Sequence, residues 1–317
     1  MTVSYRRWAV APLCVAIGSA AVTAHVWGFP GPTVEHHGTA VREVKAVSLE
    51  VTDTGGLARL FADLGYSLKT VRGGAPVPRV LVASLPNDIR KVKSIGLRTQ
   101  TFRKMILPMV LTTNEAIKRD RERLLVLVAK KNRPGAELTA SENAWLDSLA
   151  REYRAKPGDY AALKRRVDVI PPSLALAQAI EESGWGTSSF ARKGNALFGQ
   201  ETYLRSATGM PGKSGARPFK IKVFPTLLEA VNAYARNLNT HPAYKDLRAV
   251  RAQARARGRM APGHALAGTL IRYSERRHAY VRTIRKIIGQ FDLAKLDGAT
   301  LAKGPQIHVR EADGPAS

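Results

Sequence analysis

The chain has 317 residues, of which 44% are apolar and 24% are charged. These fractions are typical of a folded globular protein and exclude a disordered or collagen-like chain. Lys and Arg outnumber Asp and Glu by 50 to 25, and the formal charge of +25 predicts attraction to polyanions such as nucleic acid, anionic lipid or an acidic polymer. Cys14 is the single cysteine, which excludes an internal disulfide framework and a cysteine-based metal site.

The first 24 residues have the layout of a secretory signal peptide. Arg6 and Arg7 precede an apolar run from Ala9 to about Val26, and small residues favour cleavage after Ala24. The run also reaches the lower length limit of a membrane span, so an uncleaved inner-membrane anchor is the alternative. We therefore expect export to the periplasm or cell envelope and no nucleic-acid partner.

The next two parts of the chain differ in pattern. Residues 25–76 are punctuated by Gly and Pro and have no sustained period, which predicts a linker of low order with one short helix around Leu57–Leu64. Residues 77–167 are predicted to form a helical N-terminal region. Within it, Pro108 should kink or divide a helix that runs from Leu97 to about Lys131.

Residues 168–292 form the predicted second domain, and residues 304–317 are predicted to be a disordered polar tail. A helix that begins after Pro171 has no charged residue from Ser173 to Ile180, which is typical of a helix buried in the middle of a domain.

A short β-hairpin and a further helix are predicted later in this domain. Apolar and basic residues alternate over Phe219–Val223, which indicates a half-exposed strand, and Phe198–Tyr203 is its expected partner. Thr226 and Glu229 form a capping-box pattern, which predicts that a helix begins there.

Two carboxylates, Glu181 and Glu182, end the buried helix and precede the sequence Ser-Gly-Trp-Gly. A carboxylate at a helix C-terminus faces the negative end of the helix dipole, and burial disfavours its ionised form, so both effects raise its pKa. A carboxyl group that is protonated near neutral pH can act as the general acid in glycosidic cleavage. An ordinary exposed helix end is the alternative, and periodicity does not distinguish Glu181 from Glu182.

Two motifs together resemble the signature of the peptidoglycan glucosaminidase family. They are AQAIEESGWG at Ala177–Gly186 and GNALFG at Gly194–Gly199. The resemblance covers about residues 77–290. Three further segments resemble the Bax-type branch of this family: Val80–Asp88, Asn237–Tyr244 and Arg272–Arg276.

This resemblance implies an α+β fold that is mainly α. A lysozyme-like catalytic domain with a small β-hairpin lobe would follow the helical region. The family's catalytic acid is the Glu directly before Ser-Gly-Trp-Gly, which is Glu182 here, and Glu181 would be a neighbour at the substrate site that raises its pKa. Tyr273 and Tyr280 match the family's tyrosine-containing motif, and either is expected to reach the scissile bond, with Tyr273 ranked first.

The resemblance also implies which residues shape the groove. Trp185, Asn195 and Phe198 are expected to line it. Several relatives carry a second acidic residue on the hairpin, and Glu201 is the only acid between Phe198 and Glu229. Two interpretations stay open, because either Glu201 acts as that second carboxylate or the N-acetyl group of the substrate takes its place.

The predicted function is therefore that of an endo-β-N-acetylglucosaminidase that cleaves peptidoglycan glycan strands after N-acetylglucosamine, with no cofactor and no metal. A non-catalytic wall-binding protein with a degenerate site is the alternative, and a polyanion-binding protein is a third. An arginine-rich stretch between Arg248 and Lys286 predicts a patch that attracts anionic glycan or an anionic membrane surface, while a merely solvated helix face is the other interpretation.

Overall fold

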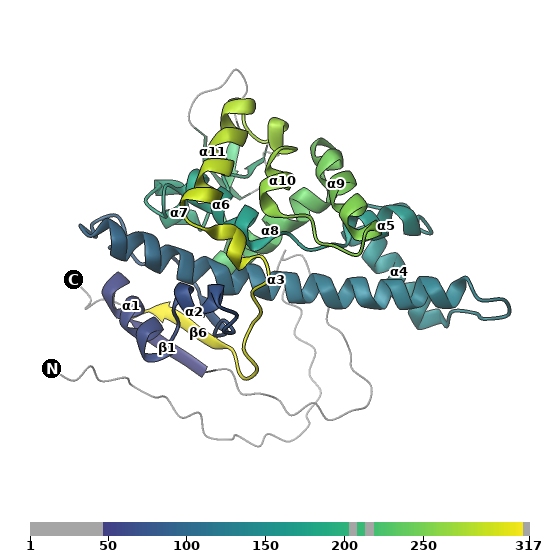
Figure 1. Cartoon of the computed structure of the whole chain (residues 1–317), viewed down its shortest axis with the longest axis horizontal. Coiled ribbons are helices and arrows are strands. Elements are labelled where there is room, and N and C mark those ends of the chain that lie inside the picture. Colours follow the sequence, from purple (N-terminus) through teal and green to yellow (C-terminus); the bar gives the residue numbers. More distant parts are fainter. Residues whose placement is uncertain (1–46, 203–207, 213–218, 313–317) are drawn as a thin grey trace, which may run out of the picture.

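The computed structural model describes residues 47–202, 208–212 and 219–312, so the predicted signal peptide and Cys14 lie outside the described residues (Figure 1). The α-helices are α1 (Thr54–Asp63), α2 (Leu68–Arg72), α3 (Ile95–Lys131), α4 (Ala140–Glu152), α5 (Tyr160–Arg166), α6 (Pro172–Ser183), α7 (Ser189–Gly194), α8 (Leu227–Thr240), α9 (Lys245–Ala256), α10 (Gly263–Ala267) and α11 (His278–Gln290). The strands are β1 (Val47–Val51), β2 (Val80–Val82), β3 (Glu201–Thr202), β4 (Gly209–Pro211), β5 (Lys220–Lys222) and β6 (Ile307–Glu311). The predicted class, α+β and mainly α, is confirmed. No helix within the described part of the chain combines the length and the apolar character that crossing a membrane requires.

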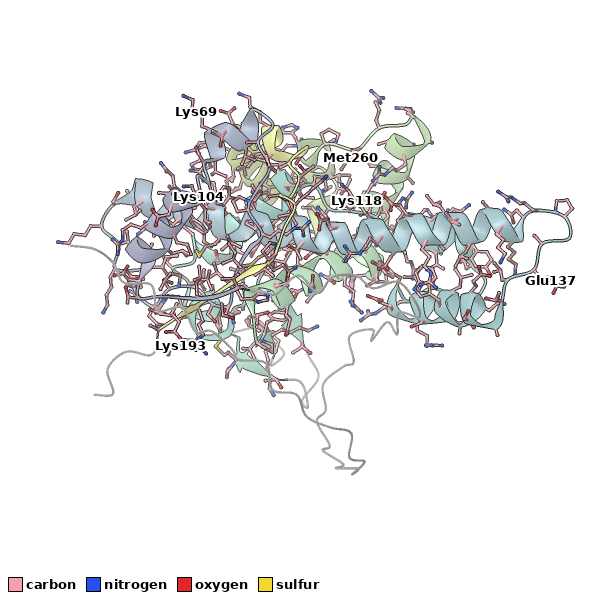
Figure 2. The ribbon with its side chains drawn as sticks, turned by 90° about the horizontal axis from the view of Figure 1, so that it is seen from below. Lys69, Lys104, Lys118, Glu137, Lys193 and Met260 are labelled. Carbon is pink, nitrogen blue, oxygen red and sulfur yellow. The ribbon has the colours of Figure 1, made fainter. Side chains whose placement is uncertain are left out.

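The long helix α3 separates the two halves of the molecule. On one side it packs against α1 and β2, and on the other against α6 and α8 (Figure 1). Its last turns project beyond the rest of the molecule and carry α4 alongside, with Glu137 in the loop at the far end (Figure 2). The helical region therefore packs directly on the half of the chain that contains α6.

Helix α3 is not divided at Pro108. Of the two predicted outcomes, a kink or a division into two helices, the division is wrong. It runs unbroken for 37 residues from a Ser94 N-cap, whose side chain accepts a hydrogen bond from the Leu97 N–H. A proline removes one backbone hydrogen bond from a helix. At this position, however, the helix is buried, since Met105, Ile106, Leu107, Met109 and Val110 surround the proline, and tertiary packing dominates helix stability.

The prediction of a low-order linker is wrong for residues 47–76, although the short helix expected there exists as α1. Asp53 caps α1 by accepting a hydrogen bond from the Gly56 N–H, and Leu57 and Phe61 are fully buried on its inner face. The prediction of a disordered tail is also wrong for residues 304–312. There β6 is the central strand of a parallel sheet with the order β1-β6-β2.

Helix α6 lies at the centre of the second half. It contacts α3, α10, α11 and the short 3₁₀ helix Leu293–Leu296, and its residues from Pro172 to Ile180 are buried. Proline in the first helical turn suits a helix start, because the N–H that proline lacks has no partner there in any case. The carboxylate of Asp297 holds this end by accepting from the Ser173 N–H and Oγ at 2.8 and 2.9 Å.

The small β lobe follows α7. Strand β5 pairs with β3 in antiparallel register, with Glu201 opposite Ile221, as the hairpin prediction requires. A third strand, β4, pairs with the other edge of β5, so the sheet order is β3-β5-β4. The segment between the two predicted hairpin strands thus contributes a third strand.

Candidate active site

The site is built around Glu182 at the last turn of α6. Gly184 adopts a left-handed backbone conformation (φ 55°), which ends the helix directly after the two carboxylates. The Ser183 hydroxyl donates to the Ala179 carbonyl at 2.6 Å and accepts from the Gly186 N–H at 2.9 Å. This tight turn fixes the direction in which the Glu182 side chain leaves the helix.

A buried hydrogen-bonded chain leads to the Glu182 carboxyl. The Tyr234 hydroxyl donates to Gln178 Oε1 at 2.7 Å, and Gln178 Nε2 donates to the Tyr280 hydroxyl at 2.8 Å. Tyr280 in turn hydrogen-bonds to the side chain of Glu182. Because Gln178 donates to the Tyr280 oxygen, the single hydroxyl proton of Tyr280 is left to point at the carboxyl.

The environment raises the pKa of Glu182 to about 7. Burial is the largest cause, and the negative charge of Glu181 acts in the same direction. The hydrogen bond from Tyr280 and the positive charge of Arg276 oppose the rise. The carboxyl group is therefore extensively protonated near neutral pH, as a proton donor must be.

Aromatic side chains from separate segments surround this carboxyl. Tyr273 stacks on Tyr280 with ring centroids 5.4 Å apart, and its hydroxyl donates to the Phe198 carbonyl at 3.1 Å. Phe198 stacks on Tyr234 at 3.9 Å. Tyr244 contacts Tyr273. The two tyrosines expected from the sequence thus meet at Glu182, and Tyr280, rather than the first-ranked Tyr273, makes the direct hydrogen bond.

The loop after α7 forms the opposite side of the site. Gly199 has a left-handed backbone (φ 59°), and a Cβ placed on it would lie 3.5 Å from Glu182 Oε2. The backbone of this loop therefore approaches the carboxyl closely, and Phe198 is brought to the site as expected.

Glu181 lies beside this site but points to another partner. Its carboxylate forms an ion pair with the guanidinium of Arg276, which also lies over the Tyr280 ring at 5.8 Å from the centroid. Its placement beside the site agrees with the role of a neighbour implied by the family.

Two residues expected to line the groove are placed elsewhere. The ring of Trp185 packs edge-on against Phe102 and Phe291, on the side of α3, and not against the tyrosines around Glu182. Asn195 is buried in a left-handed conformation, and its Nδ2 donates to the carbonyls of Phe224 and Pro225. The side-chain contacts of both residues therefore hold the loops that follow α6 and α7.

Glu201 is exposed on β3. Among the described residues, the charges that act on the pKa of Glu182 are those of Glu181 and Arg276. Glu201 as a second carboxylate stays a prediction.

Gln178, Tyr234 and Tyr244 also lie at the site, although the sequence did not predict them as site residues. Gln178 had a usable signal, because it is the one amide in an otherwise apolar, buried helix and lies one turn before Glu182. A buried amide needs partners, so it should have been expected to hydrogen-bond to other site residues. The tyrosines had no such local signal.

The predicted arginine-rich surface patch is partly wrong. Arg248 and Arg251 are buried, and they donate to backbone carbonyls that include those of Leu238 and Asp168. Arg255 binds the Asp168 carboxylate. These arginines hold the structure together because they satisfy buried acceptors, so they are not available to a membrane surface. Within the described ranges, no group of three or more His, Cys, Asp or Glu side chains is arranged to hold a metal ion.

Comparison of the sequence with known proteins finds a matching family. The glucosaminidase family, described as mannosyl-glycoprotein endo-β-N-acetylglucosaminidase, matches residues 158–293. Protein bax from Escherichia coli (strain K12) is 35% identical over 204 residues, which are 62% of this chain and 71% of that protein.

Two solved structures show a weaker likeness. The catalytic domain of the autolysin Auto from Listeria monocytogenes is 17% identical with a TM-score of 0.32, over 52% of this chain and 92% of that chain. An N-acetylmuramoyl-L-alanine amidase from Staphylococcus aureus is 16% identical with a TM-score of 0.31, over 52% of this chain and 46% of that chain. On the strength of the family match and the likeness to Protein bax, the chain belongs to the glucosaminidase family, in its Bax-type branch.

Proposed function

We propose that this protein is a peptidoglycan hydrolase, an endo-β-N-acetylglucosaminidase in which Glu182 is the general acid. The observation that carries the proposal is the placement of the Glu182 carboxyl group, at the end of the buried helix α6 and between Tyr280 and the backbone of Gly199. Burial there raises the pKa of Glu182 to about 7. The family assignment supports the reaction class.

In the proposed reaction, Glu182 transfers its proton to the glycosidic oxygen while the bond from that oxygen to C1 of N-acetylglucosamine breaks. Positive charge develops at C1 and the ring oxygen of N-acetylglucosamine as the bond breaks. Water then adds to C1, which supplies the new hydroxyl group, and returns a proton to Glu182. Tyr280 donates a hydrogen bond to the carboxylate that forms, so it stabilises Glu182 most when the proton has left. A mechanism assisted by the substrate's N-acetyl group needs no second carboxylate, and Glu201 on β3 acting as that second carboxylate is the alternative.

Export belongs to the same proposal, because peptidoglycan lies outside the cytoplasm. The sequence of residues 1–24, with paired arginines before an apolar run, supports it. The N-terminal sequence of the protein isolated from the cell envelope would distinguish cleavage after Ala24 from a retained anchor.

The decisive experiment compares Glu182→Gln with Glu181→Gln in the chain from residue 25 onward, which retains every described residue. The two variants make the same chemical change at adjacent positions of one helix end. Purified peptidoglycan is digested with each protein, and mass spectrometry identifies the new chain ends.

Wild type and Glu181→Gln are expected to release reducing N-acetylglucosamine ends, whereas Glu182→Gln should lose about 10³-fold of the rate, within the usual range for a general acid. Equal activity of the two variants would overturn the role of Glu182. If no protein releases reducing ends but all bind the wall, the protein is a non-catalytic wall-binding protein.

A further inference from the structure

Arg276 is held beside the reacting carboxyl and still faces solvent. Its guanidinium pairs with Glu181, the residue next to Glu182, and lies over the ring of Tyr280, which hydrogen-bonds to Glu182. Half of the Arg276 side chain, 52%, is exposed. Since a guanidinium has five N–H donors in a planar fork, one ion pair with Glu181 leaves donors directed away from it.

The backbone also fixes this arginine. The Arg276 N–H donates to Ser274 Oγ, and its carbonyl accepts from the Ala279 N–H at 2.9 Å, just before α11. Arg277 follows with a positive φ of 46°, which a residue with a side chain rarely adopts. Such strained positions persist where the surroundings hold them and are frequent at binding sites. The turn thus delivers Arg276 to one place beside the carboxyl.

The chemistry of peptidoglycan puts a distinctive group at that place, if the proposed function is correct. When Glu182 protonates the glycosidic oxygen, that oxygen becomes O4 of the muramoyl sugar on the leaving side. The neighbouring ring carbon carries the lactyl ether of the muramoyl sugar at O3. The lactyl group ends in a carboxylate on peptide-free strands and in a peptide, which bears its own carboxylates, on intact strands.

We propose that Arg276 binds a carboxylate carried by the lactyl substituent of the muramoyl sugar next to the scissile bond, and so selects muramoyl-containing strands over plain N-acetylglucosamine polymers. The inference rests on the proposed function. Arginine suits this role, because its planar fork forms paired, charge-assisted hydrogen bonds with a carboxylate. Glu181 holds the guanidinium in place and leaves the ligand to bind at the exposed edge.

Binding is measured by calorimetry in the Glu182→Gln background, where ligands stay intact. Four tetrasaccharides are compared: two N-acetylglucosamine–N-acetylmuramic acid repeats with free lactyl carboxylates, the same with L-Ala-D-Glu on each lactyl group, the same with neutral lactyl methylamides, and chitotetraose, which lacks lactyl groups. The first two separate a lactyl carboxylate from a peptide carboxylate, and the last two lack the charge.

One or both anionic ligands should bind about tenfold more tightly than the neutral ones, and Arg276→Gln should remove that difference. Arg276→Lys keeps the charge without the fork and should retain part of it. Arg282→Gln, an exposed arginine on α11, is the matched control and should change nothing.

Equal binding of all four ligands, or a preference that survives Arg276→Gln, would overturn the inference. Its failure differs from failure of the proposed function, which is tested by the release of reducing ends by the protein that retains Glu182. A protein that cleaves peptidoglycan but binds all four ligands alike would refute only the role of Arg276.

Discussion

Two carboxylates in the same half of the molecule are taken out of water, and their pKa values move in opposite directions. Asp168, 2% exposed, is surrounded by arginines: Arg255 donates to both of its oxygens, at 2.7 and 3.1 Å, and Arg251 and Arg121 lie at 3.5 and 3.9 Å. Burial alone would raise the pKa of Asp168, but these arginines outweigh it and the pKa is lowered.

Glu182 has a different set of neighbours. Tyr280 and the backbone at Gly199 lie beside it, and Arg276, the cation that acts on its pKa within the described part of the chain, is itself paired with Glu181. Burial therefore dominates, and the pKa of Glu182 rises to about 7. The comparison teaches that burial by itself does not decide the protonation of a carboxyl group; the charge of its partners does.

The largest effect is expected from Asp168→Asn. Removing one partner of a buried ion pair leaves uncompensated charges, and here the positive charges of Arg251, Arg255 and Arg121 would remain, so we expect a loss of about 3–5 kcal/mol in the free energy of unfolding. Thermal and urea unfolding measure it. Asp292→Asn, at an exposed pair with Lys295, is the control and should change stability little. A similarly small effect of Asp168→Asn would contradict the structural role of the cluster.

Tyr280→Phe should increase the difference in pKa between Asp168 and Glu182, because it removes the hydrogen bond that stabilises ionised Glu182. The pKa of Glu182 should then rise further, by about one unit, because a hydrogen bond to a charged group contributes about 1.5–3 kcal/mol. The pH at which activity declines would move upward, while the maximal rate would fall about tenfold. A pH–rate profile of the wild type, expected to decline above about pH 7, is the reference. An unchanged profile would show that Tyr280 does not act on the pKa of Glu182.

The pH dependence of stability should differ in sign between the two acids. The pKa of Asp168 is lowered in the folded state, so its contribution is present above its ordinary value of 3.8 and is lost as the pH falls through the folded-state value. The stability gap between wild type and Asp168→Asn should therefore narrow in acid.

Glu182 should behave in the opposite way. Its raised pKa means that ionisation is disfavoured in the folded state, so the wild type loses stability relative to Glu182→Gln as the pH rises from 4.5 through about 7. Melting temperatures of the three proteins across pH 3–8 test both statements. Parallel curves for all three would refute both.

The smallest effect is expected from Gly199→Ala. A left-handed backbone with a Cβ costs about 1–2 kcal/mol, and the methyl group would contact Glu182 Oε2 at an ordinary distance of 3.5 Å. Stability should fall by that amount, and the peptidoglycan rate should fall several-fold, because the methyl group occupies space beside the proton donor. Gly65→Ala, at a similar φ of 63° with open space around it, should cost the same stability without the loss of rate.

Local sequence determined the elements whose signals lie within a few residues of one another. The proline start, apolar body and glycine stop of α6 were read correctly, and the Thr226 side chain caps α8 by accepting from the Glu229 N–H as predicted. Glu182 was identified because the residues around it form a contiguous motif. Such signals can be recognised without knowing which elements pack against one another.

Only the tertiary structure decided the remaining features, because they join segments far apart in the chain. Strands β1 and β6 pair in parallel across most of the chain, with Val47 opposite Ile307, and neither has a local pattern that would predict its partner. For the same reason, Trp185 could be assigned to a groove when its ring belongs against α3.

The arrangement of the site residues was also decided by the tertiary structure. Residues Gln178, Tyr234 and Tyr280 come from three helices, α6, α8 and α11, and become one hydrogen-bonded chain only when those helices pack. The sequence by itself placed two carboxyl groups at the end of a buried helix, and the resemblance of the motif to the family singled out Glu182 as the candidate acid. The fold decided which groups surround that carboxyl group, and their charge sets its pKa.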